Sequence, residues 1–392
     1  MKGKWKLGAA IFFISLIVGI LFRMSPAALL KNILLASIHP TTLQLISLII
    51  LVIFLGNLMQ ERGNLAKIGS SLEVLIRNRR LESVIPPAFM GLLPMPAGAL
   101  FSAPIVQELS RKTGASPEKK TLLNYWFRHL WEYMWPLYPG LILAAALLNV
   151  QIRDIILAQY PLTLAAIAAG FIFCMGKGSS LPSSPSFKPR KKTEFAKEIE
   201  VLFFNTWPIL AVIFLVLILK IELLLAILLI VLVVLTSSKI KGYQIWLPFK
   251  KSLSLSMIFL ILSVMIFKRV FEVSDAFSVI PTIFSHWGLS PLIILFFAPF
   301  LAGLLTGITS ASIGIAFPLL LPFMVRSQPN LTYAMFAYAA GFAGVLLSPF
   351  HLCLILTREY FRADLKKIYK HLSLPVAFVV LIALLLVWLN GF

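Results

Sequence analysis

The chain has few charged residues and almost no cysteine. Only 13% of its 392 residues are charged, with 15 acidic residues against 35 basic ones. Composition of this kind lies outside the range of soluble globular domains. The two cysteines, Cys174 and Cys353, lie inside apolar runs without a spacing partner. This placement favours packed thiols over a disulfide or a metal pair.

The sequence also lacks the short motifs of several enzyme and motor classes. It contains no GxxxxGK[ST], no GxSxG and no HExxH. A nucleotide-driven motor is therefore not expected, and neither is a bound cofactor. An intramembrane enzyme that uses Ser102 as nucleophile and His129 as base stays only a minor alternative.

Long apolar runs dominate what is present. Hydrophobic residues make up 59% of the chain, and the mean hydropathy is +0.94. Nine runs are long enough to cross a bilayer as helices. They fall at about 7–22, 43–59, 121–147, 155–175, 201–219, 222–238, 252–268, 331–356 and 374–391. We expect an all-α polytopic membrane protein.

The basic residues predict the orientation. A net charge of +20 would suggest nucleic-acid binding in a soluble chain, but here it sits in short loops between apolar runs. The positive-inside rule then places the N-terminus in the cytoplasm and, after nine crossings, the C-terminus outside. We expect a protein of the cytoplasmic membrane with no nucleic-acid partner.

Two stretches lie between apolar limbs that are too short to cross about 30 Å of hydrocarbon. The first is GLLPMPAGALFSAP, Gly91 to Pro104, and the second is GLLTGITSASIGIAFP, Gly303 to Pro318. Their Gly, Pro, Ser and Thr residues suit a chain reversal inside protein or a wet cavity. The sequence therefore predicts two re-entrant helical hairpins, 82–113 and 291–326.

Residues recur at a nearly constant offset, which indicates an internal repeat. The spacing is 212 residues between Gly91 and Gly303, and 213 both for Tyr125 and Tyr338 and for Pro136 and Pro349. With the predicted topology, the copies are inverted, and transporters with this design bind solute where the copies meet. The expected units are a first repeat 1–175, a basic linker and connecting span 176–220, and a second repeat 221–392.

The hairpin tips and the third apolar run supply the candidate site residues. Hydroxyls, freed carbonyls and helix N-termini at the second tip could bind sodium or a carboxylate, although Ser and Thr also cap helices. The first tip would contribute mainly backbone groups. For substrate we single out Pro96, Ala97, Gly98, Ser102, Asn124, Arg128, Thr309, Ser310, Ser312 and Ser348; for ion coupling, Thr306, Gly307, Glu132 and His129.

Asn124, Arg128 and Glu132 recur every four residues, which would put them on one helical face. Charged side chains inside a membrane are costly, so these should face protein or water. Arg128 and Glu132 either pair with each other or serve an anion and a coupling proton. Pro136, Pro139 and Pro349 should interrupt their helices, and Ser348 and His351 flank the second break.

The stretches PMPAGALFSAP (94–104) and NYWFRHLWEY (124–133) resemble those of an integral membrane family, domain of unknown function 401. That family is grouped with the ion transporter superfamily of divalent-anion/sodium symporters and of citrate and gluconate permeases. The resemblance implies an inverted-repeat fold, elevator-like transport and a homodimer. Neither tip has the Ser-Asn-Thr triplet of the better-known symporters, so substrate and coupling ion do not carry over.

Taken together, these features predict a secondary transporter of a small anionic organic solute, coupled to Na⁺ or H⁺. A lipid or lipid-head-group transporter of the same fold is the main alternative, because a basic cytoplasmic face also suits acidic lipids. A passive channel is a further alternative.

Overall fold

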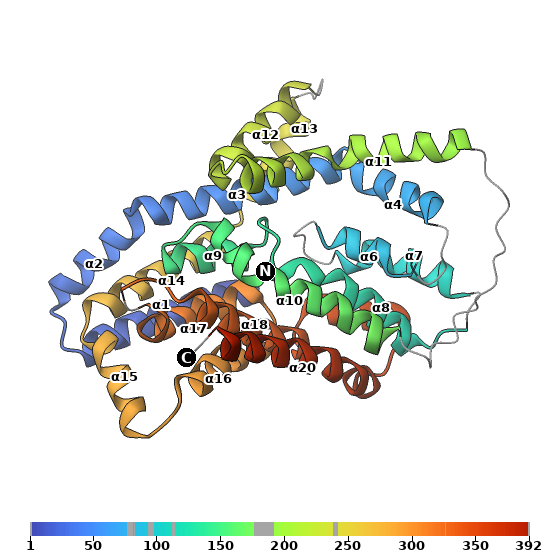
Figure 1. The fold of residues 1–392 in the computed structure, drawn as a ribbon. Coiled ribbons are helices and arrows are strands. Elements are labelled where there is room, and N and C mark those ends of the chain that lie inside the picture. The colour runs from blue at the N-terminus through green and yellow to red at the C-terminus, as the bar shows by residue number, and fades with distance from the viewer. Residues whose placement is uncertain are drawn as a thin grey trace.

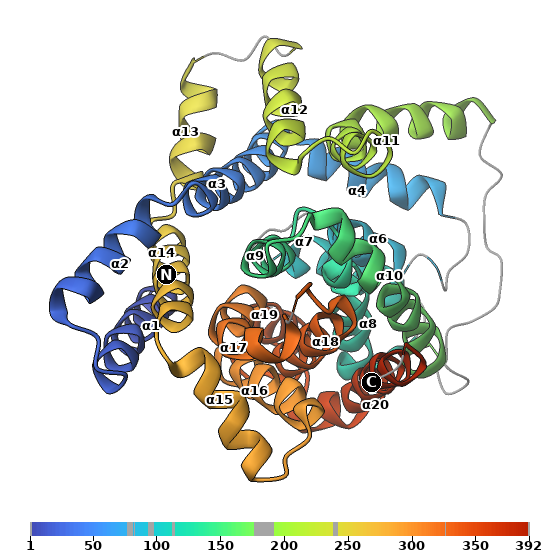
Figure 2. The ribbon, with the colours of Figure 1, turned by 60° about the vertical axis from the view of Figure 1, so that its left-hand side comes forward.

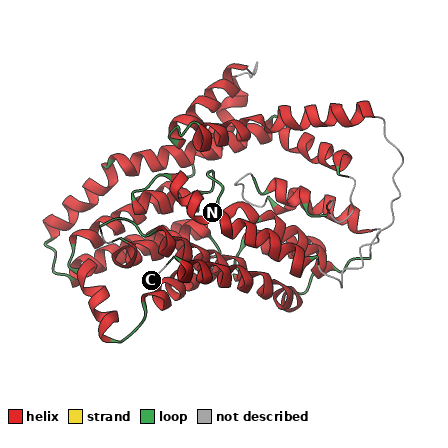
Figure 3. Ribbon diagram, viewed as in Figure 1, coloured by secondary structure: helices red, strands yellow, loops and turns green. Residues whose placement is uncertain are grey.

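The computed structural model describes residues 2–76, 81, 83–92, 98–111, 114–175, 192–237, 242–325 and 327–390. Within these residues the regular structure is helical (Figure 3), apart from one isolated bridge between Val325 and Pro329. Six helical stretches are long and apolar enough to cross a membrane. They are Pro40–Glu61, Ile152–Cys174, Phe195–Ile218, Gln244–Val273, Leu331–Phe361 and Leu365–Leu389. The chain is a multi-pass membrane protein.

An outer wall of helices curves around one side of the molecule (Figure 2). Within it α1 packs on α14, α3 on α12 and α13, and α4 on α11. The wall consists of α1 (Lys2–Leu21), α2 (Pro26–Ile38), α3 (Pro40–Glu61), α4 (Asn64–Leu75), α11 (Lys192–Ile213), α12 (Leu223–Ser237), α13 (Gly242–Ser252) and α14 (Leu255–Val273). A short π-helical segment, Phe214–Ile218, continues α11.

The remaining helices form an inner body (Figures 1 and 2). Its centre is filled by large buried side chains, among them Tyr125, Phe317, Tyr338 and Phe342. From the first half come α6 (Ile85–Met90), α7 (Ala99–Arg111), α8 (Pro117–Arg128), the 3₁₀ helix η1 (Leu130–Tyr133), α9 (Pro139–Leu148) and α10 (Ile152–Ala169). From the second half come α16 (Pro291–Thr306), α17 (Thr309–Met324), α18 (Leu331–Leu347), α19 (Leu352–Phe361) and α20 (Leu365–Leu389). Helix α15 (Ala276–His286) leads from the wall into this second set.

Cavities lie along the border between the wall and the body. One of about 520 Å³ is lined by Gln44 and Glu222 from the wall and by Asn149 and Arg153 from the body. A second, of about 670 Å³, lies between α2, α3 and α14 of the wall and the end of α9. A third, of about 250 Å³, separates Phe89 and Leu92 from α11. Open space thus lies at several places along this border.

Two apolar stretches are broken by short segments that are not α-helical, as the prolines predict, and the first of these segments contains the 3₁₀ helix η1. Helix α8 ends at Arg128 and the chain resumes as α9 at Pro139; α18 ends at Leu347 and resumes as α19 at Leu352. Pro136 and Pro349 lie in these breaks. Proline has no N–H to donate to the preceding turn, so a helix cannot pass through such a segment undisturbed. The predicted interruptions are confirmed.

Helices α16 and α17 form an antiparallel hairpin of two 16-residue limbs. Gly307 makes the turn with a φ of 64°, a conformation that glycine adopts without strain. Each limb is about 24 Å long, shorter than the roughly 30 Å of a hydrocarbon core. The corresponding first pair is α6 and α7, whose tip at 93–97 lies outside the described residues.

The hydropathy of the sequence did not predict helix α2 of the wall, nor helix α13 between the predicted runs 222–238 and 252–268. Helix α2 has only 13 residues and carries Lys31 and Asn32, so hydropathy averaged over a membrane-crossing length does not detect it. Ser25 caps its first turn by accepting from the N–H of Ala28 at 3.2 Å, and Pro40 then starts α3. The predicted first loop is therefore largely helical.

Candidate functional site

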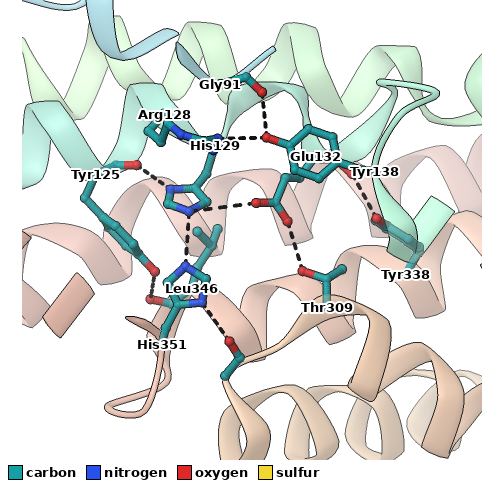
Figure 4. Close-up of polar contacts among 11 residues, drawn as sticks. Gly91, Tyr125, Arg128, His129, Glu132, Tyr138, Thr309, Tyr338, Leu346 and His351 are labelled. Carbon is teal, nitrogen blue, oxygen red and sulfur yellow. Dashed lines mark hydrogen bonds and ion pairs between the residues drawn. The ribbon is translucent and has the colours of Figure 1, made fainter. Parts of the chain in front are cut away.

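The two interrupted stretches meet at their breaks in the middle of the inner body (Figure 4). The break after α8 brings Arg128, His129 and Glu132, and the break before α19 brings His351. The turn between α16 and α17 lies beside them, with Thr309 directed at Glu132. Three separate segments of the chain thus surround one small polar region.

Matching side chains anchor the first limb of each hairpin. Tyr138, the residue before α9, donates its hydroxyl to the carbonyl of Gly91 at 2.6 Å. His351, the residue before α19, contacts the carbonyl of Gly307 through Nδ1 at 2.8 Å. Gly91 ends α6 and Gly307 ends α16. In each half, the residue that restarts the broken helix holds the end of the hairpin limb.

Two tyrosines tie the halves to each other. The Tyr125 hydroxyl donates to the carbonyl of Leu346 at 3.0 Å, and the Tyr338 hydroxyl donates to the carbonyl of Glu132 at 2.9 Å. Both carbonyls lie where a helix is interrupted, so no backbone N–H four residues later donates to them. Each tyrosine therefore satisfies an acceptor that the break in the other half leaves open.

Glycine allows the hairpins to approach the broken helices closely. A Cβ atom placed on Gly91 would lie 2.5 Å from the carbonyl oxygen of Arg128, and one on Gly303 would lie 2.1 Å from that of Gly341. No side chain fits at such distances. These two glycines are the pair separated by 212 residues in the sequence, and close backbone contact explains why both positions have no side chain.

The ionisable side chains of the first break are almost completely buried. Arg128 is 2% exposed and donates from Nη1 to the Tyr138 hydroxyl at 2.8 Å. Glu132 is 8% exposed, and its Oε2 accepts from Thr309 at 2.9 Å. Helix α8 ends at Arg128, so Glu132 belongs to the following 3₁₀ turn. The four-residue spacing therefore gives a shared helical face for Asn124 and Arg128 only.

The two histidines of the site are in direct contact. His129 Nε2 lies 3.1 Å from His351 Nε2 and 3.8 Å from Glu132 Oε1. Cys353 joins them: one nitrogen from each ring and the Cys353 sulfur all lie within 4.8 Å of one another. From the sequence we proposed His129 for ion coupling and noted that His351 flanks the second helix break. Cys353 was predicted to be a packed thiol. The spacing His351-x-Cys353 at the start of a helix was the available signal.

Several predicted site hydroxyls are hydrogen-bonded to nearby groups that hold the helices together. Ser312 donates to the carbonyl of Pro299 at 2.8 Å and Ser348 to that of Leu304 at 2.6 Å. Thr306 donates to the carbonyl of Ala302 at 2.7 Å. The Ser312 and Ser348 contacts join α16 to α17 and to the end of α18, whereas the Thr306 contact lies within α16. Ser310 is buried at the turn.

Ser102 and Asn124 make a separate contact between α7 and α8. The Ser102 hydroxyl donates to Asn124 Oδ1 at 2.6 Å, and the Asn124 amide donates to the carbonyl of Ala99 at 2.8 Å. Both residues are fully buried close to the first tip. Gly98 is buried there too, whereas the predicted residues Pro96 and Ala97 lie outside the described part of the chain.

Comparison with known proteins gives a family and a fold. The family described as "Protein of unknown function (DUF401)" matches residues 2–390. No curated protein matches the chain. Among solved structures, the crystal structure of the Alcanivorax borkumensis YdaH transporter, described as having an unusual topology, is similar with a TM-score of 0.60. The match covers 98% of this chain and 97% of that chain at 13% identity, which establishes similarity of fold.

Proposed function

We propose that this chain, which belongs to the DUF401 family, is a secondary active transporter that moves a small anionic organic solute. Its fold resembles that of a transporter over nearly the whole length of both chains. The observation that carries the proposal is a buried cation, Arg128, at the point where two interrupted helices and two hairpin limbs converge. Interrupted helices at a repeat interface are where secondary transporters bind their solutes.

Arg128 is suited to recognise a carboxylate. A guanidinium presents several N–H donors in a plane and binds carboxylates in a bidentate way. In this region, Ser102, Asn124 and Gly98 line the neighbouring first tip, and Thr309 and Ser310 begin the limb that returns from the second turn. We propose these residues, with Arg128 and the tip residues Pro96 and Ala97, as the substrate site.

We further propose that the protein is built from two inverted repeats, 1–175 and 221–392, joined by 176–220. Equivalent helices begin at matching positions: α9 at 139 and α19 at 352, α10 at 152 and α20 at 365, a difference of 213 in both cases. Tyr138 and His351 lie at equivalent positions and make equivalent contacts, to the carbonyls of Gly91 and Gly307. Tyr125 and Tyr338 are also equivalent and each binds a carbonyl of the other half, which supports the same relation. In this arrangement nine spans cross the membrane, α6–α7 and α16–α17 are re-entrant, the N-terminus is cytoplasmic and the C-terminus lies outside.

The wall and the body support an elevator mechanism for this transport. The cavities of about 520 and 670 Å³ lie along their border, where a sliding body needs a loose contact. The body carries both hairpins and both breaks, so it would move with the solute. The wall would stay fixed, within a homodimer. Motion of rigid bodies past each other is a common route to alternating access.

Coupling to an ion gradient would use the oxygen-rich second turn. Thr306, Gly307 and Glu132 offer hydroxyl, carbonyl and carboxylate oxygens there, and His129 adjoins Glu132. Hard cations such as sodium prefer oxygen ligands, and unwound carbonyls commonly supply them in transporters. We propose Na⁺ as the first coupling ion to test and H⁺ as the second.

Uptake by purified protein in liposomes tests this function. Radiolabelled carboxylates are offered under an inward Na⁺ gradient, an inward H⁺ gradient or no gradient. We expect uptake of at least one carboxylate above its equilibrium level, driven by one of the gradients. Arg128→Ala should abolish it at unchanged expression, whereas Arg358→Ala, at an exposed arginine of α19, should not. Normal uptake by Arg128→Ala would remove Arg128 from the site, and gradient-independent flux far above carrier rates would indicate a channel.

A further inference from the structure

The two histidines face each other through the same ring nitrogen. His129 places Nδ1 2.6 Å from the carbonyl oxygen of Tyr125, and His351 places Nδ1 2.8 Å from that of Gly307. A carbonyl can only accept, so in each neutral ring the proton is on Nδ1 and the lone pair is on Nε2. The two Nε2 atoms are 3.1 Å apart. Two lone pairs at this distance repel each other unless a proton or a metal ion lies between them.

The third nearby ligand atom is a sulfur. Cys353 Sγ and one nitrogen of each histidine all lie within 4.8 Å of one another. Zinc binds histidine nitrogen at about 2.0–2.1 Å and cysteine sulfur at about 2.3 Å in tetrahedral geometry, so its ligand atoms are roughly 3.3–3.6 Å apart. The two nitrogens already have nearly this spacing. Since the present separation is at most 4.8 Å, a shift of roughly 1.2 Å would bring the sulfur to this spacing.

The surroundings resemble those of metal-binding histidines. In such sites the second ring nitrogen donates to a carbonyl or carboxylate, which fixes the ring and its tautomer. Both rings meet this condition here through Tyr125 and Gly307. The Glu132 carboxylate, 3.8 Å from His129 Nε2, adds negative charge on one side, and Arg128 directs Nη1 to Tyr138. A cysteine thiolate and this carboxylate together would offset the two charges of a divalent ion away from water, which leaves Arg128 as the remaining positive charge of this region.

We propose that His129, His351 and Cys353 form a binding site for a transition-metal ion of the zinc type. The chemistry selects the metal: two imidazoles and a thiolate suit zinc and similar borderline or soft ions and do not suit magnesium or calcium. Its ligands come from both interrupted stretches, so the ion would join the break after α8 to the start of α19. This site goes beyond the proposed transport and does not depend on it.

The decisive experiment measures metal in the full-length protein, purified in detergent through a tag without histidine. After exposure to Zn²⁺ and removal of free metal, the wild type should retain about one zinc ion per chain, the number that one three-ligand site predicts. With Co²⁺ it should show a thiolate-to-cobalt charge-transfer band. X-ray absorption of the bound metal should find nitrogen and sulfur neighbours, and this needs no variant.

Matched variants locate the ligands. Cys353→Ser should lose the charge-transfer band and Cys174→Ser, at the other buried cysteine, should keep it. His351→Gln should reduce zinc retention at least tenfold, while His371→Gln, at an exposed histidine, should not. A wild type that retains no metal, or a metal shell without sulfur, overturns the proposal. Equal zinc retention by Cys353→Ser and Cys174→Ser would also overturn the proposal. Since no step requires uptake, these results are independent of the transport assay.

Discussion

The two halves of the site share a backbone frame and differ in chemistry. Both halves hold a hairpin limb through the residue that restarts a broken helix, Tyr138 in the first half and His351 in the second. At the positions of Arg128 and Glu132, 213 residues on, the second half has Gly341 and Val345. The backbone arrangement that both halves share thus requires carbonyl acceptors, side-chain donors and glycines. The charged side chains Arg128 and Glu132 occur in the first half only. We infer that the charges serve a ligand or an ion.

The largest effects on stability are expected at the two glycines where close backbone contact leaves no room for a side chain. Gly91→Ala and Gly303→Ala each place a Cβ within 2.5 Å of a carbonyl oxygen, and overpacking of this kind costs about 1–3 kcal/mol or more. Both variants should lower the midpoint of thermal unfolding in detergent. Gly56→Ala, whose Cβ would meet nothing within 4 Å, is the control and should be neutral or stabilising. If only one half is sensitive, the shared frame is wrong.

The next largest effect is expected from loss of the contact between Glu132 and the second hairpin. Thr309→Val removes the hydrogen bond to the Glu132 carboxylate, and a bond to a charged group contributes about 1.5–3 kcal/mol. In the uptake assay, the apparent affinity for the coupling ion or the solute should fall by roughly tenfold or more. Thr309→Ser keeps the hydroxyl and should behave like the wild type. A loss in Thr309→Ser but not in Thr309→Val, which keeps the methyl group, would point to packing of that methyl group instead.

The paired tyrosines give a smaller and symmetrical effect. Tyr125→Phe and Tyr338→Phe each leave one buried carbonyl without its donor, at a cost of about 1–3 kcal/mol. We expect similar decreases in the unfolding midpoint for the two variants, and none for Tyr360→Phe at an exposed position. A decrease confined to one tyrosine would show that the halves are not held together reciprocally.

The smallest effects should come from the hydroxyls of the second hairpin. Ser312→Ala and Ser348→Ala remove donors to the carbonyls of Pro299 and Leu304. Each should cost about 0.5–1.5 kcal/mol of stability and leave the solute concentration for half-maximal uptake unchanged. A large rise in that concentration, with no change in stability, would return both serines to the substrate site.

The sequence predicted the parts of the fold that depend on local chemistry. Proline lacks an N–H, so Pro136 and Pro349 predicted the two breaks, and Gly307 predicted a turn between short apolar limbs. Helix α2 was missed because 13 residues cannot fill a window of membrane-crossing length. The predicted alignment of Glu132 with Arg128 on one helical face was wrong, because α8 ends before the charge recurs.

The contacts of the site depend on residues that are distant in sequence. Nothing near Tyr138 indicates that its hydroxyl reaches Gly91, 47 residues earlier, or that His129 meets His351, 222 residues later. Cys353 was assigned to packing because it lies inside an apolar run without a spacing partner. Only the folded arrangement brings the three ligand atoms together.

A cryo-electron microscopy structure in nanodiscs, with Na⁺ and a carboxylate identified by the uptake assay, tests the central claim most directly. We predict ligand density beside Arg128, between the break after α8 and the turn at Gly307, with α16 and α17 entering and leaving the bilayer on the same side. Density confined to the clefts along the outer wall, or an α16–α17 pair that crosses the bilayer completely, would contradict the assignment.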